Sequence, residues 1–274
     1  MTTDRYVHGY RPRESERLHD QARTLAQLLH GDTRYPPEST VLEAGCGVGA
    51  QTVTLAQNSP GARVTSVDIS AESLGEARRR VGHAGLGNVT FRQGDLFELP
   101  FDPASFDHVF VCFVLEHLED PVGALEALGR MLRPGGSITV IEGDHGSTSF
   151  HPESPAARAA IACQIELQAR AGGNALVGRQ VYPLLAAAGF DQPQISPRMV
   201  YVDASRPELV DGFIRKTFTA MVQGVRDPAI AAGLIDPASF DAGIAALHRT
   251  TQPDGVFSYT FFKGVAHKAR ASDG

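Results

Sequence analysis

A glycine-rich turn after a short apolar segment is the feature of the sequence that most suggests chemistry. The turn reads Glu43-Ala-Gly45-Cys-Gly47-Val-Gly49-Ala50, and a second apolar segment ends at Asp68. Its glycine spacing also satisfies the pattern by which dinucleotides bind at a strand-to-helix turn, and a tight turn without a ligand is the plainer alternative. Glu43 argues against a dinucleotide, because its carboxylate would repel a pyrophosphate and would favour a cationic ligand without phosphate. Asp68 can accept hydrogen bonds from ribose hydroxyls in either case.

Strands and helices alternate through the first half of the chain and must position this turn. An amphipathic helix is predicted over residues 14–30, whose apolar side chains fall on one stripe. Strands are predicted over residues 40–44, 63–68, 88–93, 106–114 and 137–142, and helices over residues 50–58, 70–82 and 120–132. This rhythm predicts parallel βαβ units and a doubly wound sheet.

The rhythm changes after residue 142. Helices are predicted over residues 154–171 and 179–188, and strands over residues 194–202 and 255–263. We expect one domain over residues 1–274, because the sequence shows no internal repeat or low-complexity linker. Its parts are an N-terminal helical segment at 1–37, a cofactor-binding core at 38–145, helices at 146–192, and the last two strands at 193–266 around a helical insertion at 203–254.

Several short motifs accompany the glycine turn in a fixed order. They are Val41-Leu-Glu-Ala-Gly-Cys-Gly-Val-Gly49, Gly94-Asp95-Leu96, Leu99-Pro-Phe101 followed by Phe106-Asp107, Leu115-Glu-His-Leu118 and Leu132-Arg-Pro-Gly-Gly136. Together they resemble the class I S-adenosyl-L-methionine (SAM)-dependent methyltransferases, in particular the small-molecule group that includes ubiquinone and menaquinone biosynthesis enzymes. The resemblance implies a doubly wound, Rossmann-like α/β fold with seven strands, the last antiparallel. It also implies SAM as methyl donor and S-adenosyl-L-homocysteine (SAH) as product.

The resemblance assigns the two ends of the cofactor site. For the methionine end it implies the backbone of the turn and a few flanking side chains, namely Glu43, Gly45, Cys46, Gly47 and Phe113. Gln51 is a further candidate, for the methionine carboxylate, although an ordinary first-turn helix residue is an equal alternative. For the adenosine end it implies Asp68 on the ribose, Ile69 against the adenine, and Asp95 on the adenine amine beside Gly94 and Leu96.

Ionisable residues that follow two predicted strands are candidates for the acceptor side. Methyl transfer from a sulfonium mainly needs alignment, plus a base when the acceptor carries a proton. Glu142, Asp144 and His145 follow the fifth predicted strand, and His117 follows the fourth. Ligands of doubly wound sheets lie beyond such strand ends, so these four residues are the catalytic candidates, with turn formation and helix capping as the alternative. His117, Asp144 and His145 could form a metal-binding set, but direct displacement requires no metal and we predict none.

Three residues outside the core are candidates for substrate contact. Tyr10 lies in an aromatic and glycine-containing N-terminal segment that, by resemblance, would fold over SAM; packing on the sheet edge is the alternative. Phe213 and Met221 lie in the insertion at 203–254, which we expect to be a helical lid. At helical spacing they could equally be one packed face.

Composition narrows the function class. The net charge is −6 and the longest basic run is three arginines, so no nucleic-acid partner is expected. No apolar run is long enough to span a bilayer, and the N-terminus does not read as a secretory signal. Three cysteines without metal-type spacing are typical of a reduced, cytoplasmic protein.

The sequence therefore predicts an N- or O-methyltransferase acting on a small-molecule metabolite without a metal. C-methylation of an activated carbon, an NAD-dependent oxidoreductase and a non-catalytic SAM-binding module are the alternatives. The acceptor, and whether the protein is a monomer or a homodimer, do not follow from the sequence.

Overall fold

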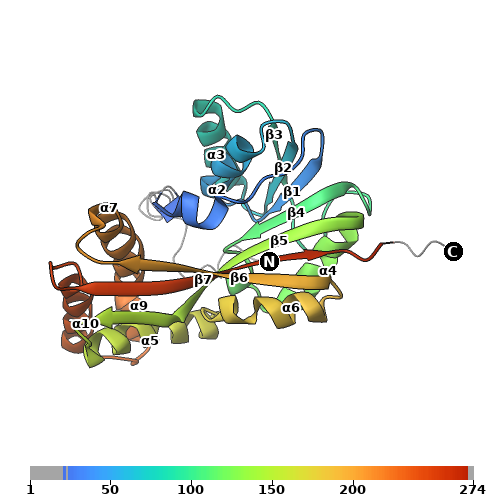
Figure 1. Cartoon of the computed structure of the whole chain (residues 1–274). Helices are drawn as coiled ribbons and strands as arrows, with labels where there is room; N and C mark the ends of the chain where they lie inside the picture. Colours follow the sequence, from blue (N-terminus) through green and yellow to red (C-terminus); the bar gives the residue numbers. More distant parts are fainter. Residues whose placement is uncertain (1–20, 23, 271–274) are drawn as a thin grey trace.

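A seven-stranded mixed sheet organises the computed structural model, which describes residues 21, 22 and 24–270 (Figure 1). Its strand order is β3-β2-β1-β4-β5-β7-β6, and β7 runs antiparallel to both of its neighbours while the other pairs are parallel. The strands are β1 (Thr40–Ala44), β2 (Arg63–Asp68), β3 (Val89–Gln93), β4 (Phe106–Cys112), β5 (Leu132–His151), β6 (Asp191–Val202) and β7 (Val256–His267). The predicted fold class is confirmed.

Helices cover both faces of the sheet. Those of the first half and the turn after β4 are α2 (Ala50–Asn58), α3 (Ala71–His83), η2 (Leu115–His117) and α4 (Pro121–Met131). Those of the second half are α5 (Pro155–Arg170), η3 (Val177–Gln180), α6 (Val181–Ala187), α7 (Pro207–Leu209), the π-helical η4 (Val210–Thr219), α8 (Ala220–Gly224), α9 (Arg226–Ala231) and α10 (Pro237–Arg249). Side chains of α4 and α6 pack in one core cluster, and those of α2 pack in another, because alternate strand residues face opposite sides.

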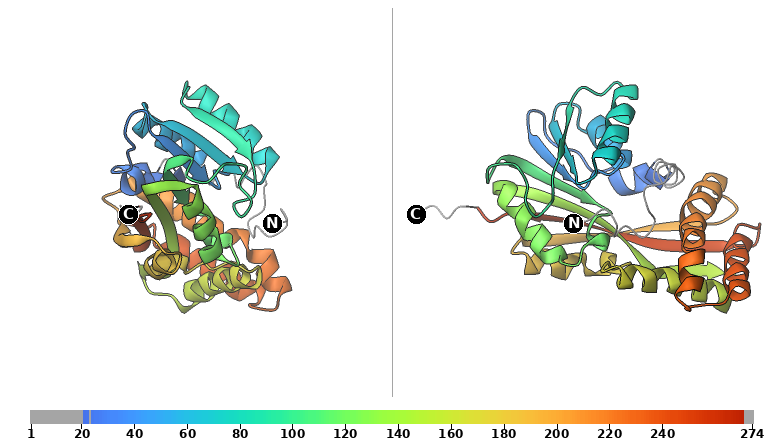
Figure 2. Two further views of the ribbon diagram at one scale, coloured as in Figure 1. Left: turned by 90° about the vertical axis from the view of Figure 1, so that its right-hand side faces the viewer. Right: turned by 180° about the vertical axis from the view of Figure 1, so that it is seen from behind.

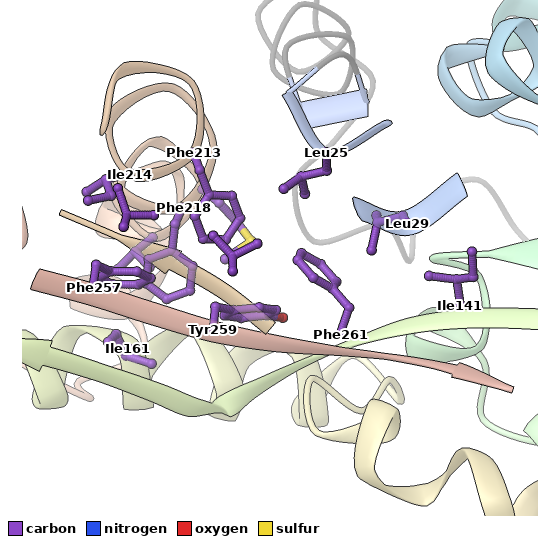
Figure 3. Close-up of a cluster of buried hydrophobic side chains, with 14 of the residues drawn as sticks. Leu25, Leu29, Ile141, Ile161, Phe213, Ile214, Phe218, Phe257, Tyr259 and Phe261 are labelled. Carbon is purple, nitrogen blue, oxygen red and sulfur yellow. The ribbon is translucent and has the colours of Figure 1, made fainter. Parts of the chain in front are cut away.

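The N-terminal helix packs with the α2 side of the sheet. The predicted helix over 14–30 is helical in its described part, which ends at His30, and the rest lies outside the described residues. Leu25 and Leu29 are buried in the same core cluster as Phe261 of β7 (Figure 3). Two leucines one turn apart therefore fix the helix against the sheet.

Strand β5 is much longer than predicted. We expected it to end at Glu142, but it continues to His151 in antiparallel pairing with β7. The apolar run does stop near Glu142, and the continuation depends on a partner strand that lies more than a hundred residues away in the chain. The prediction that Glu142, Asp144 and His145 follow the end of a strand is therefore wrong: they lie inside it.

The extended parts of β5, β7 and β6 carry most of the second-half helices. Helices α5, α7, α9 and α10 gather at the end of these strands that lies away from the C-terminus (Figures 1 and 2). An aromatic cluster of η4 and β7, comprising Phe213, Phe218, Phe257, Tyr259 and Phe261, fills the space between them (Figure 3). We call the helices at this end of the strands, which are α5 and the helices of the insertion at 203–254, the helical wing.

Candidate functional site

The glycine turn between β1 and α2 adopts backbone conformations that favour glycine. Gly45 and Gly47 have φ values of 71° and 50°, in the region that side chains with a Cβ rarely enter. A Cβ on Gly45 would lie 2.6 Å from a methyl group of Val114, whereas a Cβ on Gly47 would meet no described atom within 4 Å. Gly47 therefore borders open space, as expected where a ligand passes close to the backbone.

Glu43 lies beneath this turn as a buried acid. Its Oε2 accepts hydrogen bonds from the hydroxyls of Thr52 (2.7 Å) and Ser66 (2.6 Å). Burial raises the pKa of Glu43 to about 7, and the nearby Asp68 charge acts in the same direction. A cationic ligand group beside Glu43 would favour the ionised form.

Asp68 at the end of β2 is held by backbone donors. Its Oδ2 accepts from the backbone N–H of Gly47 (2.7 Å) and its Oδ1 from that of Ser70 (2.9 Å). A carboxylate has further lone pairs, so both oxygens can still accept hydroxyl hydrogens. The backbone bonds fix its orientation toward such a ligand.

One cavity of about 260 Å³ joins these groups. All eleven residues predicted for the cofactor line it: Glu43, Gly45, Cys46, Gly47, Gln51, Asp68, Ile69, Gly94, Asp95, Leu96 and Phe113. His117, His145 and Met221, predicted for the acceptor side, also line it. Their roles stay predictions, but the structure brings these fourteen residues to one place.

Glu142 is buried and supports the segment after β4 from behind. Phe113 has a φ of 58°, unusual for a residue other than glycine. Glu142 Oε1 accepts from the next two backbone N–H groups, those of Val114 (3.0 Å) and Leu115 (2.8 Å). Burial, reinforced by the Glu116 charge, raises the pKa of Glu142 well above its usual range. Glu142 is not among the described residues that line this cavity, and its hydrogen bonds support the segment after β4. Its predicted contact with the acceptor stays a prediction.

A bulge in β5 directs His145 toward the cavity. Between Asp144 and Ser149 the pairing with β7 shifts, so that several residues of β5 oppose only the step from Thr260 to Ser258. Bulges of this kind re-aim side chains and are common beside active sites. His145 Nδ1 lies 2.8 Å from the hydroxyl of Tyr259, and His145 is buried.

Asp144 is held away from the cavity by an ion pair. Both of its oxygens bind the guanidinium of Arg179, at 2.7 and 2.8 Å. His145 lines the cavity and Asp144 does not, so the two neighbouring side chains point to different sides. Of the three residues in the predicted polar group, Glu142, Asp144 and His145, only His145 is among the described residues that line the cavity.

The structure separates the substrate candidates. Met221 of α8 lines the cavity, whereas Phe213 of η4 does not and packs against Phe218, Phe257, Tyr259 and Phe261. The packing of Phe213 favours the alternative of a packed face, and its predicted substrate contact stays untested. Tyr10 lies outside the described residues.

Sequence analysis missed two aromatic lining residues, Tyr259 and Phe261. The pattern Phe257-Ser-Tyr259-Thr-Phe261 repeats an aromatic residue at every second position, which predicts one aromatic strand face. That signal was present, but the cavity position depends on the pairing of β7 with β5.

Two further geometric findings concern metals and membranes. Among residues 21, 22 and 24–270, no three His, Cys, Asp or Glu side chains are grouped to hold a metal ion. No helix within the described residues combines the length and apolar character needed to cross a membrane.

Comparison with known proteins identifies the family of the core. Residues 42–140 match the family described as methyltransferase domain. With the strand order and the glycine turn, this match identifies the region as a class I SAM-dependent methyltransferase domain. The resemblance inferred from the motifs is confirmed.

Two relatives show the extent of the similarity. An uncharacterised 37.1 kDa protein from a transposon of Streptomyces fradiae is 34% identical over 215 residues, which cover 77% of this chain and 61% of that protein. A demethylmenaquinone methyltransferase of Listeria welshimeri is 34% identical over 110 residues, which cover 40% of this chain and 47% of that protein. The chain thus spans less than two thirds of the length of either relative.

Solved structures share the fold at low identity. The [4+2]-cyclase SpnF superposes with a TM-score of 0.56 at 19% identity, covering 91% of this chain and 82% of that one. A phosphoethanolamine N-methyltransferase of Haemonchus contortus in complex with SAM gives a TM-score of 0.56 at 18% identity, covering 90% and 52%. At these identities the likeness establishes the fold alone.

Proposed function

We propose that this protein transfers the methyl group of SAM to a nitrogen or oxygen atom of a small molecule. The observation that carries the proposal is the cavity that joins the predicted cofactor residues to His145 and Met221. A donor and an acceptor bound next to each other in one cavity are held at reacting distance, which replaces a bimolecular encounter in solution.

The residues present suit SAM. The open space at Gly47 admits a ligand close to the backbone, and the Glu43 carboxyl suits the ammonium of its methionine part. Asp68 suits the ribose hydroxyls, and Asp95, beside Leu96, suits the adenine amine. When bound, SAM supplies an activated methyl group at a sulfonium centre.

His145 is the proposed base. The acceptor atom forms a bond to the methyl carbon while the carbon–sulfur bond breaks, and its electron pair goes to sulfur so that SAH leaves. The acceptor releases its proton, and an imidazole nitrogen of His145 accepts it. Tyr259, bonded to Nδ1, orients the ring. His117, which lies 3.4 Å from a Glu116 oxygen, also borders the cavity and is the second candidate.

Binding and turnover test the proposal separately. Calorimetry with SAM, SAH and NAD is expected to show binding of SAM and SAH alone. Asp68→Ala is expected to weaken SAM binding by on the order of 1.5–3 kcal/mol, the range for a hydrogen bond to a charged group. Tight NAD binding would favour an oxidoreductase instead.

Incubation with labelled SAM and a metabolite pool is expected to yield labelled small molecules, and their structure reveals whether N, O or C is methylated. SAM binding without any turnover would favour a non-catalytic module.

A further inference from the structure

A hydrogen bond joins the N-terminal helix to the cavity wall. Nε2 of His30, the last residue of that helix, lies 2.7 Å from Oε1 of Gln51 in the first turn of α2. His30 is buried and Gln51 lines the cavity. Because a carboxamide oxygen can only accept, the imidazole donates and its Nε2 carries the hydrogen.

Burial keeps this imidazole neutral. It lowers the pKa of His30 to about 4, against the opposing effect of the bond to Gln51. A neutral ring with hydrogen on Nε2 has a bare lone pair on Nδ1, and no donor among the described residues reaches that atom. Buried acceptors without a donor are uncommon. In this ring orientation Nδ1 has no hydrogen bond among the described residues, while Nε2 keeps its bond to Gln51.

The bond determines what Gln51 can offer a ligand. With its oxygen engaged by His30, the amide can offer a ligand of the cavity only N–H donors. An ionised carboxylate only accepts hydrogen bonds, and SAM carries one on its methionine part.

We propose that His30 is a positioning residue that orients the Gln51 amide to hold the methionine carboxylate of SAM. The inference rests on the proposed function and adds a residue outside the glycine turn to the cofactor site.

His30 is itself fixed from several sides. Its carbonyl accepts from the side chain of Asn58 (2.8 Å), and its ring lies 5.7 Å from that of Phe110. Two residues further on, Asp32 binds the buried Lys263 of β7 at 2.6 Å. These contacts fix the position of His30 and so the direction from which its imidazole donates to Gln51.

Calorimetry on the full chain with two ligands tests the proposal. SAH carries the carboxylate, whereas 5′-methylthioadenosine lacks the whole amino-acid part. His30→Phe is expected to raise the Kd of SAH by about five- to tenfold, the loss of one hydrogen bond, and to leave that of 5′-methylthioadenosine within about twofold. His30→Gln, whose amide can donate in the same place, is expected to restore SAH binding. Tyr35→Phe is the control, because it removes a buried hydrogen bond to Thr139 outside the cavity.

A second pair of measurements changes Gln51 itself. Gln51→Glu replaces the amide donors with oxygens and is expected to weaken SAH at least tenfold with 5′-methylthioadenosine unaffected. In a Gln51→Leu background, His30→Phe is expected to have no further effect. Equal losses for both ligands, or additive effects of the two substitutions, would overturn the positioning role. Failure of the wild-type chain to bind SAH would instead overturn the proposed function, and this inference with it.

Discussion

Nδ1 of His145 and the hydroxyl of Tyr259 lie 2.8 Å apart, although 114 residues separate them in the chain. His145 comes from the bulge of β5 and Tyr259 from the facing strand β7. Tyr259 is buried, and burial, with the nearby acidic side chains, raises the pKa of its hydroxyl well above the usual range. The tyrosine therefore stays a neutral partner that can accept from a protonated imidazole.

Removing either member should lower turnover without affecting cofactor binding. His145→Ala is expected to reduce kcat at least about 100-fold, the lower end for a general base. Tyr259→Phe keeps the aromatic packing and is expected to cost about tenfold, the effect of one hydrogen bond to a charged group. It should also move the acidic limb of the rate–pH profile to lower pH, because the protonated ring loses its partner.

The measurements are rate–pH profiles and SAH titrations on wild type and both variants. SAH affinity should agree within about twofold in all three, as expected for residues that act on the acceptor. If His145→Ala has the same rate and the same rate–pH profile as the wild type, His145 is not the base and His117 becomes the candidate.

A methyl group at Gly47 should interfere with ligand binding and not with folding, because a Cβ there meets no described atom within 4 Å. Gly47→Ala is expected to raise the Kd of SAH at least tenfold. Gly85→Ala is a matched control, since Gly85 also has a positive φ, meets no described atom within 4 Å at its Cβ position and does not line the cavity. Both variants carry about 1–2 kcal/mol of backbone strain, so equal SAH binding by the two would contradict the assignment of the turn.

Cofactor binding should depend on pH through Glu43. Its pKa of about 7 in the free protein means that a cationic ligand binds better once the group is ionised. SAH affinity is expected to rise between about pH 6 and pH 8, with release of protons that calorimetry in buffers of different ionisation enthalpy detects. Glu43→Gln should remove this slope, and a slope that survives the substitution would contradict the prediction.

The same group affects the stability of the ligand-free protein in the opposite direction. Because the folded-state pKa lies above the ordinary 4.5, the contribution of Glu43 to stability is fully present below pH 4.5. It is lost as the pH rises through about 7. As the pH rises from about 5 to 8, the free energy of unfolding of the wild type should therefore fall relative to that of Glu43→Gln. Denaturant melts at several pH values measure this difference.

The two wing residues should respond differently to truncation. Phe213→Ala is expected to lower the unfolding free energy by about 3–5 kcal/mol, as for a large buried aromatic residue. Met221→Ala, at the cavity wall, is expected to change the KM for the acceptor while the Kd of SAH stays within about twofold. Denaturant melts and acceptor kinetics measure the two effects, and a reversed pattern would contradict the placement of these residues.

The residues that sequence reasoning predicted for the cofactor line one cavity because their positions depend on local determinants. The turn at Gly45 to Gly49 and Asp68 at a strand end are set within single βα units, so motif order alone located them. The acceptor side depends on pairing between distant strands. Nothing near Glu142 indicates that its carboxylate accepts backbone N–H groups after β4, or that Arg179 binds Asp144. The helical periodicity of Phe213 and Met221 was read correctly, but periodicity does not distinguish a packed face from a cavity wall.

The long β5–β7 ladder and the insertion share one aromatic layer. His145 and Tyr259 are held by pairing between these strands on both sides of the bulge, whereas the insertion joins the end of β6 to the start of β7. Phe213 and Phe218 of the insertion cover Phe257 and Tyr259 of β7. A foreign insertion joined after Val202 and before Val256 would therefore leave the strand pairing in place only if it brought apolar side chains of its own to cover these two residues.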